Sequence, residues 1–415
     1  MNRSLCLSLC LALLVVAASC APQAATPAPA VPTPALQPVS AQAKASIVGA
    51  NNRFGLRLFA ELAKQDAGKN VFLSPASVAM ALAMTYNGAL GETQQAMAQA
   101  LELQGLSLDD VNNANAELRV ALANPDPKVQ LNIANSLWAK QGVPFRPEFV
   151  AANRAYYAAE VTNLDFVPGT IDTINRWVSE KTNGKIERIV DQLNPQSVLF
   201  LVNAIYFNGA WSEPFNAKAT KPGTFTTGSG EKVTLPMMRR GGHFQYLQGE
   251  GFQAVSLPYG DGRVSLYIFL PDEGSSLDEF AAGLSAERWE QWLGQFAGEQ
   301  GSLTVPRFTA EYGAELQEAL TALGMGVAFD QARADFHGMI DTTQPVWIGS
   351  VKHKTFLALT EEGTEAAGAT VVEMRAGSAP PQNPFSMVVD RPFFCAIRDN
   401  ETGAVLFVGA IVEPS

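Results

Sequence analysis

A long apolar run, residues 197–207, constrains the fold of this chain more than any other feature. A strand with one face in water alternates apolar and polar side chains, whereas this run leaves almost no polar face. It therefore predicts a strand in the middle of a large sheet, with other elements covering both of its faces. Residues 263–270 and 405–412 predict two more apolar strands.

Helices are expected to cover this sheet, because apolar residues recur every three or four positions in several stretches. Ser74 followed by Pro75 is a standard helix start, with the serine as the cap. The expected helices cover residues 47–62, 75–87, 92–101, 108–122, 171–181, 277–296 and 316–323, and further strands are expected at 71–73, 129–139 and 354–360. These elements predict one α+β domain with an exposed loop over about residues 362–391.

The residues that follow the expected strand at 354–360 are small and nearly featureless. Residues 361–370 read Glu-Glu-Gly-Thr-Glu-Ala-Ala-Gly-Ala-Thr, and residues 371–381 then become polar and proline-rich. Such a segment can adopt strand geometry without bulk, so it can enter between strands that are already paired. Gly363 suits a hinge, because glycine reaches backbone angles that other residues avoid. An Ala-rich helix end or an ordinary surface loop is the alternative interpretation.

The first residues predict export from the cytoplasm. Residues 5–16 are apolar but too few to span a membrane as a mature helix, and small residues precede Cys20. This pattern resembles a bacterial lipobox, although Ala17 stands where leucine is usual. We therefore expect a lipoprotein-type signal peptide at 1–19, a lipid on Cys20 and an extracytoplasmic protein anchored in the cell envelope, with free secretion as the alternative. Residues 20–45 are rich in Ala and Pro and predict a linker before a domain at 46–415.

Few residues point to catalysis, metal binding or nucleic-acid binding. The chain has three histidines, and it contains no His or Cys pair at metal-ligand spacing, no phosphate-binding glycine loop and no nucleophile turn. The net charge of -11 argues against a nucleic-acid partner, which needs clustered Lys and Arg. Outside the N-terminal segment only Cys395 remains, in an apolar setting typical of a buried thiol. We therefore expect no enzyme activity, no metal and no cofactor.

Several short motifs occur in the order and at the approximate spacing found in serpins, so the chain resembles the serpin family from about residue 46 to its end. The motifs lie at residues 70–77 (Asn-Val-Phe-Leu-Ser-Pro-Ala-Ser), 201–211 (Leu-Val-Asn-Ala-Ile-Tyr-Phe-Asn-Gly-Ala-Trp), 305–308, 353–354, 390–393 and 407–409. The resemblance implies the serpin fold, which has a large central, mainly antiparallel sheet with covering helices, smaller sheets and an exposed reactive-centre loop. We expect a monomer.

The resemblance also assigns roles to individual residues. Trp211 is expected at the breach, where the loop first enters the sheet. A polar cluster under the sheet, the shutter, is expected to comprise Ser74, Ser77, Asn203 and His353, although His353 as a satisfied core histidine without a switching role is the alternative. The proximal hinge of the loop is expected to comprise Glu361, Gly363, Thr364, Ala366, Ala367, Gly368, Ala369 and Thr370.

The function that the resemblance implies is inhibition of a serine protease by a suicide-substrate mechanism. The protease attacks the exposed loop and forms an acyl-enzyme, and the loop then inserts into the sheet before deacylation. In serpins the reactive bond lies about fourteen residues beyond the hinge glycine, so the resemblance implies a reactive bond at Gly377–Ser378, which favours an elastase-like or subtilisin-like target. The bond Ala376–Gly377 is an alternative, and Arg375–Ala376 is another that suits a trypsin-like enzyme.

A non-inhibitory serpin that binds a ligand or acts like a chaperone is the rival interpretation, because fold does not determine function. Alternate residues of an inserted strand face the same side of the sheet. One alternating set, Thr364, Ala366, Gly368 and Thr370, contains no charge, no large side chain and no proline, which favours inhibition. Glu365 belongs to the other set and is expected to face solvent after insertion.

Overall fold

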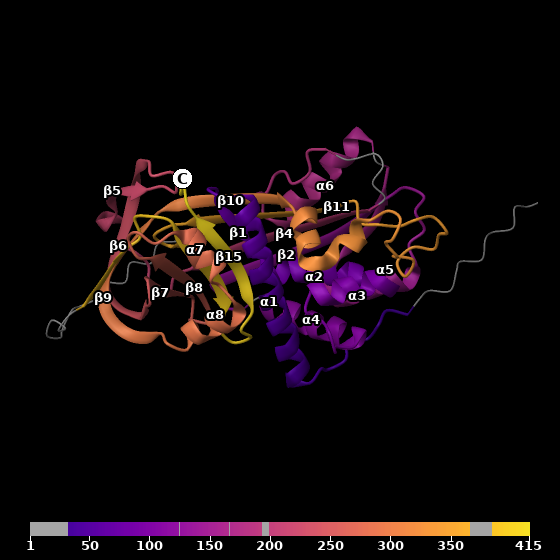
Figure 1. Cartoon of the computed structure of the whole chain (residues 1–415), viewed down its shortest axis with the longest axis horizontal. Helices are drawn as coiled ribbons and strands as arrows, with labels where there is room; N and C mark the ends of the chain where they lie inside the picture. Colours follow the sequence, from indigo (N-terminus) through magenta and orange to yellow (C-terminus); the bar gives the residue numbers. More distant parts are fainter. Residues whose placement is uncertain (1–31, 124, 166, 193–198, 366–383) are drawn as a thin grey trace, which may run out of the picture. The chain divides into compact units, whose positions relative to one another are not determined.

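The computed structural model describes residues 32–123, 125–165, 167–192, 199–365 and 384–415. Residues from Thr33 to Ser415 form one unit, in which helices pack around two sheets (Figure 1). The expected signal peptide and Cys20 lie outside the described residues.

The described part of the chain alternates helices and strands. Its helices are α1 Ala41–Gln65, α2 Pro75–Tyr86, α3 Gly91–Ala100, α4 Leu108–Ala123, α5 Pro147–Tyr157, α6 Pro168–Lys181, α7 Leu277–Ala282, α8 Ala286–Leu293 and α9 Gln317–Leu320, with short turns η1 Ala217–Ala219, η2 Thr321–Met325 and η3 Gly326–Phe329. Its strands are β1 Val71–Leu73, β2 Val129–Lys140, β3 Glu160–Leu164, β4 Leu199–Ala210, β5 Lys221–Thr226, β6 Lys232–Gly249, β7 Phe252–Tyr259, β8 Val264–Pro271, β9 Ala297–Pro306, β10 Phe308–Glu315, β11 Ser350–Leu359, β12 Gly363–Thr364, β13 Phe385–Val388, β14 Phe393–Asp399 and β15 Val405–Ile411.

Helix α1 and the segment 277–296 differ from the sequence prediction. Helix α1 begins at Ala41, inside the stretch assigned to the linker, because the Ser40 hydroxyl accepts a hydrogen bond from the Ala43 N–H at 3.1 Å and caps the helix there. The single helix predicted over residues 277–296 is wrong. It is divided into α7 and α8 because α7 ends at Gly283 and the Ser285 hydroxyl caps a new start.

The six-stranded sheet has the order β10-β11-β12-β4-β2-β3, and β11 also pairs directly with β4. Helix α2 and its neighbours cover one face of this sheet, while α6 lies on the other face (Figure 1). The pairs β11–β4 and β2–β3 are parallel, and the other pairs are antiparallel. This arrangement confirms the predicted α+β class and places β4 in the middle of the sheet.

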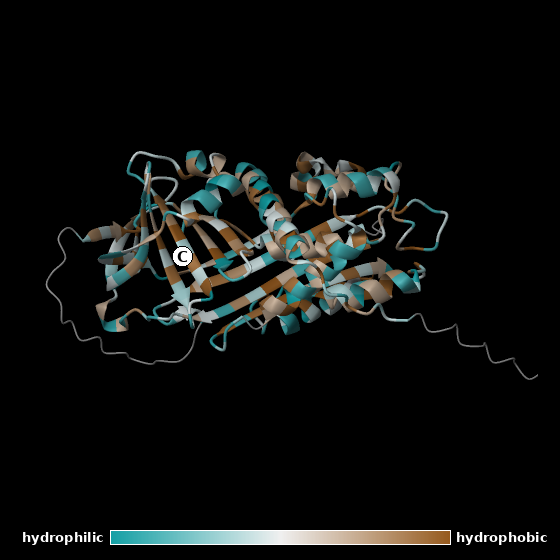
Figure 2. Cartoon of the chain, turned by 90° about the horizontal axis from the view of Figure 1, so that it is seen from below, coloured by the Kyte–Doolittle hydropathy of each residue, from teal (hydrophilic) through white to brown (hydrophobic). Residues whose placement is uncertain are grey.

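Strand β4 explains why the run at 197–207 carries so little polarity. Its residues Leu199, Leu201, Ile205 and Phe207 face the main hydrophobic core, which includes α2. The intervening residues Phe200, Val202 and Ala204 belong to a second, smaller core beneath α6 that contains Ile174 and Val178. Both faces of β4 are therefore buried, as the apolar run predicts. In Figure 2 the strands of both sheets are coloured largely as hydrophobic.

The nine-stranded sheet has the order β1-β15-β14-β8-β7-β6-β9-β13, with β5 paired to β6. The long strand β6 connects its two parts, because its beginning pairs with β5, its middle with β9 and its end with β7. Strand β13, which follows residues 366–383, pairs in parallel with β9. The chain downstream of the expected reactive bond is therefore held in this sheet.

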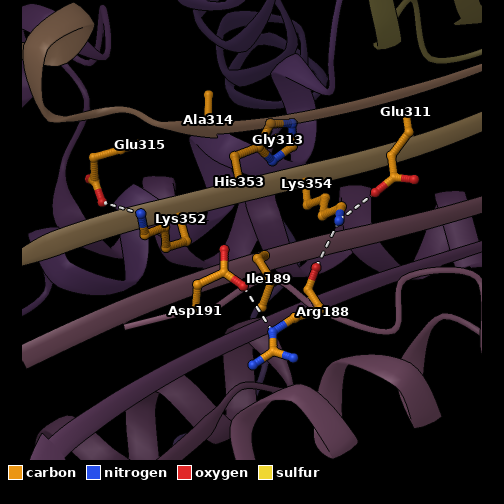
Figure 3. Close-up of a pocket in the computed structure, with 10 residues that line it drawn as sticks. All are labelled: Arg188, Ile189, Asp191, Glu311, Gly313, Ala314, Glu315, Lys352, His353 and Lys354. Carbon is orange, nitrogen blue, oxygen red and sulfur yellow. Dashed lines mark hydrogen bonds and ion pairs between the residues drawn. The ribbon is translucent and has the colours of Figure 1, made fainter. Parts of the chain in front are cut away.

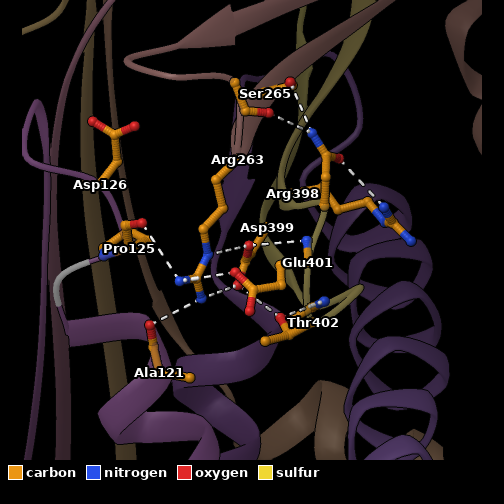
Figure 4. A network of polar contacts seen from close by, with 12 residues as sticks. Ala121, Pro125, Asp126, Arg263, Ser265, Arg398, Asp399, Glu401 and Thr402 are labelled. Carbon is orange, nitrogen blue, oxygen red and sulfur yellow. Dashed lines mark hydrogen bonds and ion pairs between the residues drawn. The ribbon is translucent and has the colours of Figure 1, made fainter.

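A buried ion pair ties the nine-stranded sheet to α4 (Figure 4). The Asp399 side chain is 0% exposed and accepts two hydrogen bonds from the Arg263 guanidinium, each at 2.9 Å. The same guanidinium donates to the carbonyls of Ala121 at 3.1 Å and Pro125 at 3.4 Å. Carbonyls in the last turn of a helix lack intrahelical partners, so Arg263 stabilises the end of α4 while it neutralises Asp399.

Candidate functional site

The site lies where β11 and β4 pair in the six-stranded sheet. These strands run parallel and pair directly from Ser350↔Phe200 to Thr355↔Ile205. Beyond this region the two-residue strand β12 lies between them, with Thr364 opposite Leu359 of β11 and opposite Gly209 of β4. We call the line between β11 and β4 the seam. In its closed part the two strands pair directly, and in its open part β12 lies between them.

A ladder of polar side chains crosses the closed part of the seam. Asn135 of β2, Asn203 of β4 and His353 of β11 are direct neighbours in register. The Asn203 amide donates to Asn135 Oδ1 at 2.6 Å, and its oxygen accepts from His353 Nδ1 at 2.6 Å. All three residues are nearly inaccessible to water. Directional bonds of this kind specify one alignment of the strands.

The ladder is joined to α2 on the covered side of the sheet. The backbone N–H of Ser74 donates to His353 Nε2 at 3.1 Å, and the Asn203 amide donates to the Ser77 carbonyl and hydroxyl at 3.1 and 2.6 Å. The structure thus brings Ser74, Ser77, Asn203 and His353 into one cluster. Asn135 belongs to it as well and was missed by sequence reasoning. The available signal was an asparagine inside a strand that is otherwise mainly apolar.

The contacts of His353 determine its protonation. Because Nε2 accepts a hydrogen bond from Ser74, the ring proton lies on Nδ1, which donates to Asn203. The ring is 1% exposed, and burial lowers the pKa of His353 to about 3. The imidazole is therefore neutral at pH 7, and the cluster is held together by hydrogen bonds between uncharged groups.

Trp211 lies at the open part of the seam and anchors the residues that precede β12. Its indole Nε1 donates to the Thr360 carbonyl at 2.9 Å, and its backbone N–H donates to the Glu362 carbonyl at 2.9 Å. The indole ring stacks on Tyr259 with 4.4 Å between centroids. The turn between β11 and β12 is therefore fixed to the end of β4.

Gly363 is the residue on which this turn depends. Its φ is +153°, and a Cβ atom added to it would lie 2.0 Å from the Gly209 carbonyl oxygen and 2.8 Å from Ala210 Cα. Both contacts are with backbone, which cannot move aside without displacing β4. No other residue fits here without disrupting the strand.

Thr364 and Glu361 secure the hinge on either side of this glycine. The Thr364 side chain is completely buried, and its hydroxyl is hydrogen-bonded to the Tyr259 hydroxyl at 2.6 Å. The Glu361 carboxylate accepts from the Thr220 hydroxyl at 2.8 Å and lies 3.6 Å from Arg307 Nη1. Thr364 thus faces the main core, as expected for the alternating set that begins there.

Glu365 does not reach solvent in this structure. Its side chain is 2% exposed and lies 3.5 Å from Lys185 Nζ. Burial raises the pKa of Glu365, although Lys185 and Tyr206 act in the opposite direction. The carboxylate points to the α6 side of the sheet, and the segment that follows α6 covers it there. The cover describes Glu365 before loop insertion, whereas the expected exposure is that of the inserted strand.

The rest of the expected loop lies outside the described residues. This applies to the hinge positions Ala366, Ala367, Gly368, Ala369 and Thr370, and to Arg375, Ala376, Gly377 and Ser378 around the expected reactive bond. Of the expected hinge, Glu361, Gly363 and Thr364 are described, together with all of the expected shutter and breach residues.

A cavity of about 380 Å³ lies beside the ladder, between β10, β11 and residues 188–191 (Figure 3). Its charged side chains are already paired. Lys354 contacts Glu311 and donates to the Arg188 carbonyl at 2.8 Å, and Lys352 lies 3.2 Å from Glu315. The cavity therefore offers no unpaired charge to a ligand. At one side of the cavity, Lys354 attaches the segment after α6 to β11.

Neither metal ligation nor membrane insertion is indicated by the part of the chain that the structure describes. No group of three or more His, Cys, Asp or Glu side chains there is arranged to hold a metal ion. Among the described helices, none combines the length and apolarity needed to cross a bilayer.

Comparison with known proteins identifies the family. The model of the family "Serpin (serine protease inhibitor)" matches residues 49–414. Human Serpin B8 is 36% identical over 374 residues, covering 88% of this chain and 98% of that protein, and the leukocyte elastase inhibitor of Bos taurus is 33% identical over 378 residues, covering 88% and 98%.

Solved structures agree with this match. The thermophilic serpin tengpin in its native state superposes with a TM-score of 0.83 at 30% identity, covering 91% of this chain and 96% of tengpin. Human thyroxine-binding globulin complexed with thyroxine gives a TM-score of 0.84 at 25% identity, covering 90% of this chain and 100% of that chain. The chain therefore belongs to the serpin family.

Proposed function

We propose that this serpin inhibits a serine protease by acting as a suicide substrate. The protease serine attacks the carbonyl of the reactive bond, the peptide C–N bond breaks, and an ester links the protease to the upstream part of the loop. The released strand then inserts between β11 and β4 and carries the protease with it before water can hydrolyse the ester. The protein itself catalyses no reaction.

The observation that carries this proposal is the position of strand β12. Gly363 and Thr364 already lie between β11 and β4, paired with both strands. The residues that would follow them into the seam are Ala366, Gly368 and Thr370 on the core side, all of them small and uncharged. Extension of β12 along the seam is therefore a continuation of pairing that has begun.

We place the reactive bond at Gly377–Ser378, fourteen residues beyond Gly363. Glycine offers no side chain to a deep specificity pocket, which favours an elastase-like or subtilisin-like protease. Cleavage at Ala376–Gly377 suits an elastase-like pocket as well, whereas cleavage at Arg375–Ala376 indicates a trypsin-like target. The mass of the C-terminal fragment released on complex formation distinguishes the three bonds.

A protease panel read on denaturing gels tests the proposal. The wild-type protein is expected to form a covalent complex with at least one serine protease. Thr364→Arg places a charge in the core beneath Tyr259, where burial of an unpaired cation costs several kcal/mol, so we expect cleavage of this variant without complex formation. Thr343→Arg, at an exposed position, is the matched control and is expected to behave like the wild type.

The outcomes of this experiment also address a second candidate function. The structural match to thyroxine-binding globulin complexed with thyroxine favours a small-molecule carrier as the alternative. Loop-cleaved inhibitor is expected to melt well above the intact protein, because the inserted strand gains hydrogen bonds along both edges. If no protease is trapped and cleavage leaves the melting temperature unchanged, the carrier function is favoured instead.

We also propose that the mature protein is an extracytoplasmic monomer anchored in the cell envelope by a lipid on Cys20, with the residues between Cys20 and α1 as its linker. Free secretion is the alternative. The lipobox-like sequence supports this proposal. In such a position the loop would be presented to extracytoplasmic proteases.

A further inference from the structure

The carboxylate of Glu365 is buried with little compensation. Its side chain is 2% exposed, and neither oxygen has a hydrogen-bond partner among the described residues. The charged group that faces it is Lys185, at 3.5 Å. The uncharged side chains of Tyr206 and Asn208 of β4 lie nearby, and the Tyr206 hydroxyl also favours the charged form of the carboxyl group. A buried carboxylate is costly unless a partner stabilises it. Lys185 is therefore the group that makes this position tolerable for a charge.

The backbone of Glu365 is held by both strands of the seam. Its N–H donates to the Ala358 carbonyl of β11 at 3.0 Å, and its carbonyl accepts from the Asn208 amide of β4 at 3.1 Å. Its φ is +57°, in the left-handed region that residues other than glycine rarely adopt. Glu365 is thus docked at the end of β12 in a conformation that needs support from its surroundings.

Lys185 is itself well placed to provide this support. It lies in the segment after α6, and its Nζ is 5.6 Å from the centroid of the Phe356 ring of β11. The same segment is attached to β11 by the hydrogen bond from Lys354 Nζ to the Arg188 carbonyl (Figure 3). These two contacts with β11 therefore fix the segment, and with it the ammonium group, above the seam.

We propose that Lys185 is a positioning residue for loop insertion. By pairing with Glu365 it keeps the end of the hinge docked as strand β12, so that insertion after cleavage extends a strand that already exists. This proposal rests on the proposed inhibitory function, but the docking that it describes can be measured without a protease.

The physical reason is that the ion pair exists only while the hinge is docked. Without Lys185, the docked state retains an unpaired buried carboxylate, whereas the undocked state exposes the carboxylate to water. Docking of the hinge therefore becomes less favourable without Lys185. In that variant β12 must form before the rest of the loop can insert. Slower insertion allows more acyl-enzyme to hydrolyse, so a larger share of the inhibitor is cleaved as substrate.

Amide hydrogen exchange of residues 359–365 in the intact protein tests the docking. Lys185→Met keeps the packing on Phe356 but removes the charge, and we expect exchange in this segment to rise by about tenfold, since a half-exposed lysine contributes less than a fully buried partner. Lys185→Arg is expected to restore slow exchange. Lys181→Met, at an exposed lysine at the end of α6, is the control.

The Glu365→Gln variant separates charge from packing. When Lys185→Met is combined with Glu365→Gln, the lysine substitution is expected to change exchange little, because no buried charge remains to be compensated. The ratio of Lys185→Met to wild-type exchange is also expected to fall on acidification, since protonation removes the same charge. Equal exchange in Lys185→Met and wild type overturns the proposal, as does an equal rise with and without Glu365→Gln.

The same variants are then mixed with a protease that the wild type traps. Lys185→Met is expected to need more inhibitor per protease inactivated, and Lys185→Arg to need the wild-type amount. Unchanged stoichiometry in Lys185→Met, despite faster exchange, overturns the role in insertion. If the wild type traps no protease, the inhibitory function fails, whereas the exchange data still decide whether Lys185 docks the hinge.

Discussion

Acid is expected to weaken this protein through one histidine, His353. The ring is buried and neutral in the folded state, where its pKa lies at about 3, against 6.5 for an unperturbed histidine. Below pH 6.5 the unfolded chain binds a proton at this position that the folded protein refuses. A folded-state pKa below the unfolded value means that stability is complete above pH 6.5 and is lost as the pH falls towards 3.

The magnitude follows from the width of this window. Each pH unit inside it costs about 1.4 kcal/mol, so lowering the pH from 6.5 to 5 removes about 2 kcal/mol of the free energy of unfolding. This loss is a substantial share of the ~5–15 kcal/mol that typically stabilises a folded domain. Glu365 acts in the opposite direction, because its pKa is raised in the folded state and its contribution to the free energy of unfolding therefore decreases as pH rises.

Urea unfolding of the intact protein between pH 7.5 and 5, followed by tryptophan fluorescence, measures the effect. His353→Gln removes the titration, while its amide can still accept from the Ser74 N–H and donate to Asn203 Oδ1. We expect the slope of stability against pH to flatten by about 1.4 kcal/mol per unit in this variant, and the comparison cancels the contribution of Glu365. His243→Gln, at an exposed histidine, is the control. Parallel pH profiles for wild type and His353→Gln would refute this account of the ladder.

Three further predictions concern other residues. Asn203→Ala leaves the Nδ1 proton of His353 and the Asn135 oxygen without partners, so we expect the free energy of unfolding, measured with urea, to fall by about 3 kcal/mol or more. Asp399→Asn leaves the Arg263 guanidinium poorly neutralised and is expected to cost about 3 kcal/mol, whereas Glu401→Gln, at a side chain that is 70% exposed, should change the midpoint little. Cys20→Ala is expected to move the protein from the membrane to the soluble fraction, or to leave its precursor unprocessed; recovery of the wild type in the soluble fraction without fatty acid would contradict the lipid anchor.

Local sequence signals predicted much of the fold. The apolar run at 197–207 corresponds to the central strand β4, because burial on both faces leaves a direct mark on composition. The pair Ser74–Pro75 marks the start of α2, because capping depends on adjacent residues. The strand β6 was not predicted, since its sequence contains a proline and paired glycines and its pairing depends on distant partners.

The site was predictable only where the family motifs name its residues. The pairing of Lys185 with Glu365 joins positions 180 residues apart, and no pattern in either segment signals it. Asn135 joins the ladder because β2 aligns with β4 in one register, which hydrophobic patterning alone does not specify when both faces of β4 are apolar. Such contacts follow from strand alignment, and that alignment is settled by the whole fold.

The ladder of Asn135, Asn203 and His353 therefore has a consequence for assembly of the sheet. Strands β4 and β11 lie far apart in the chain, and β4 presents a nearly uniform apolar surface on which a shifted pairing would bury as much apolar area. A shift by one residue would turn Asn203 away from Ser77 and toward the apolar cluster beneath α6, with its amide unpaired. The three side chains thus make the correct register more stable than a shifted register, although hydrophobic burial alone would not distinguish the two.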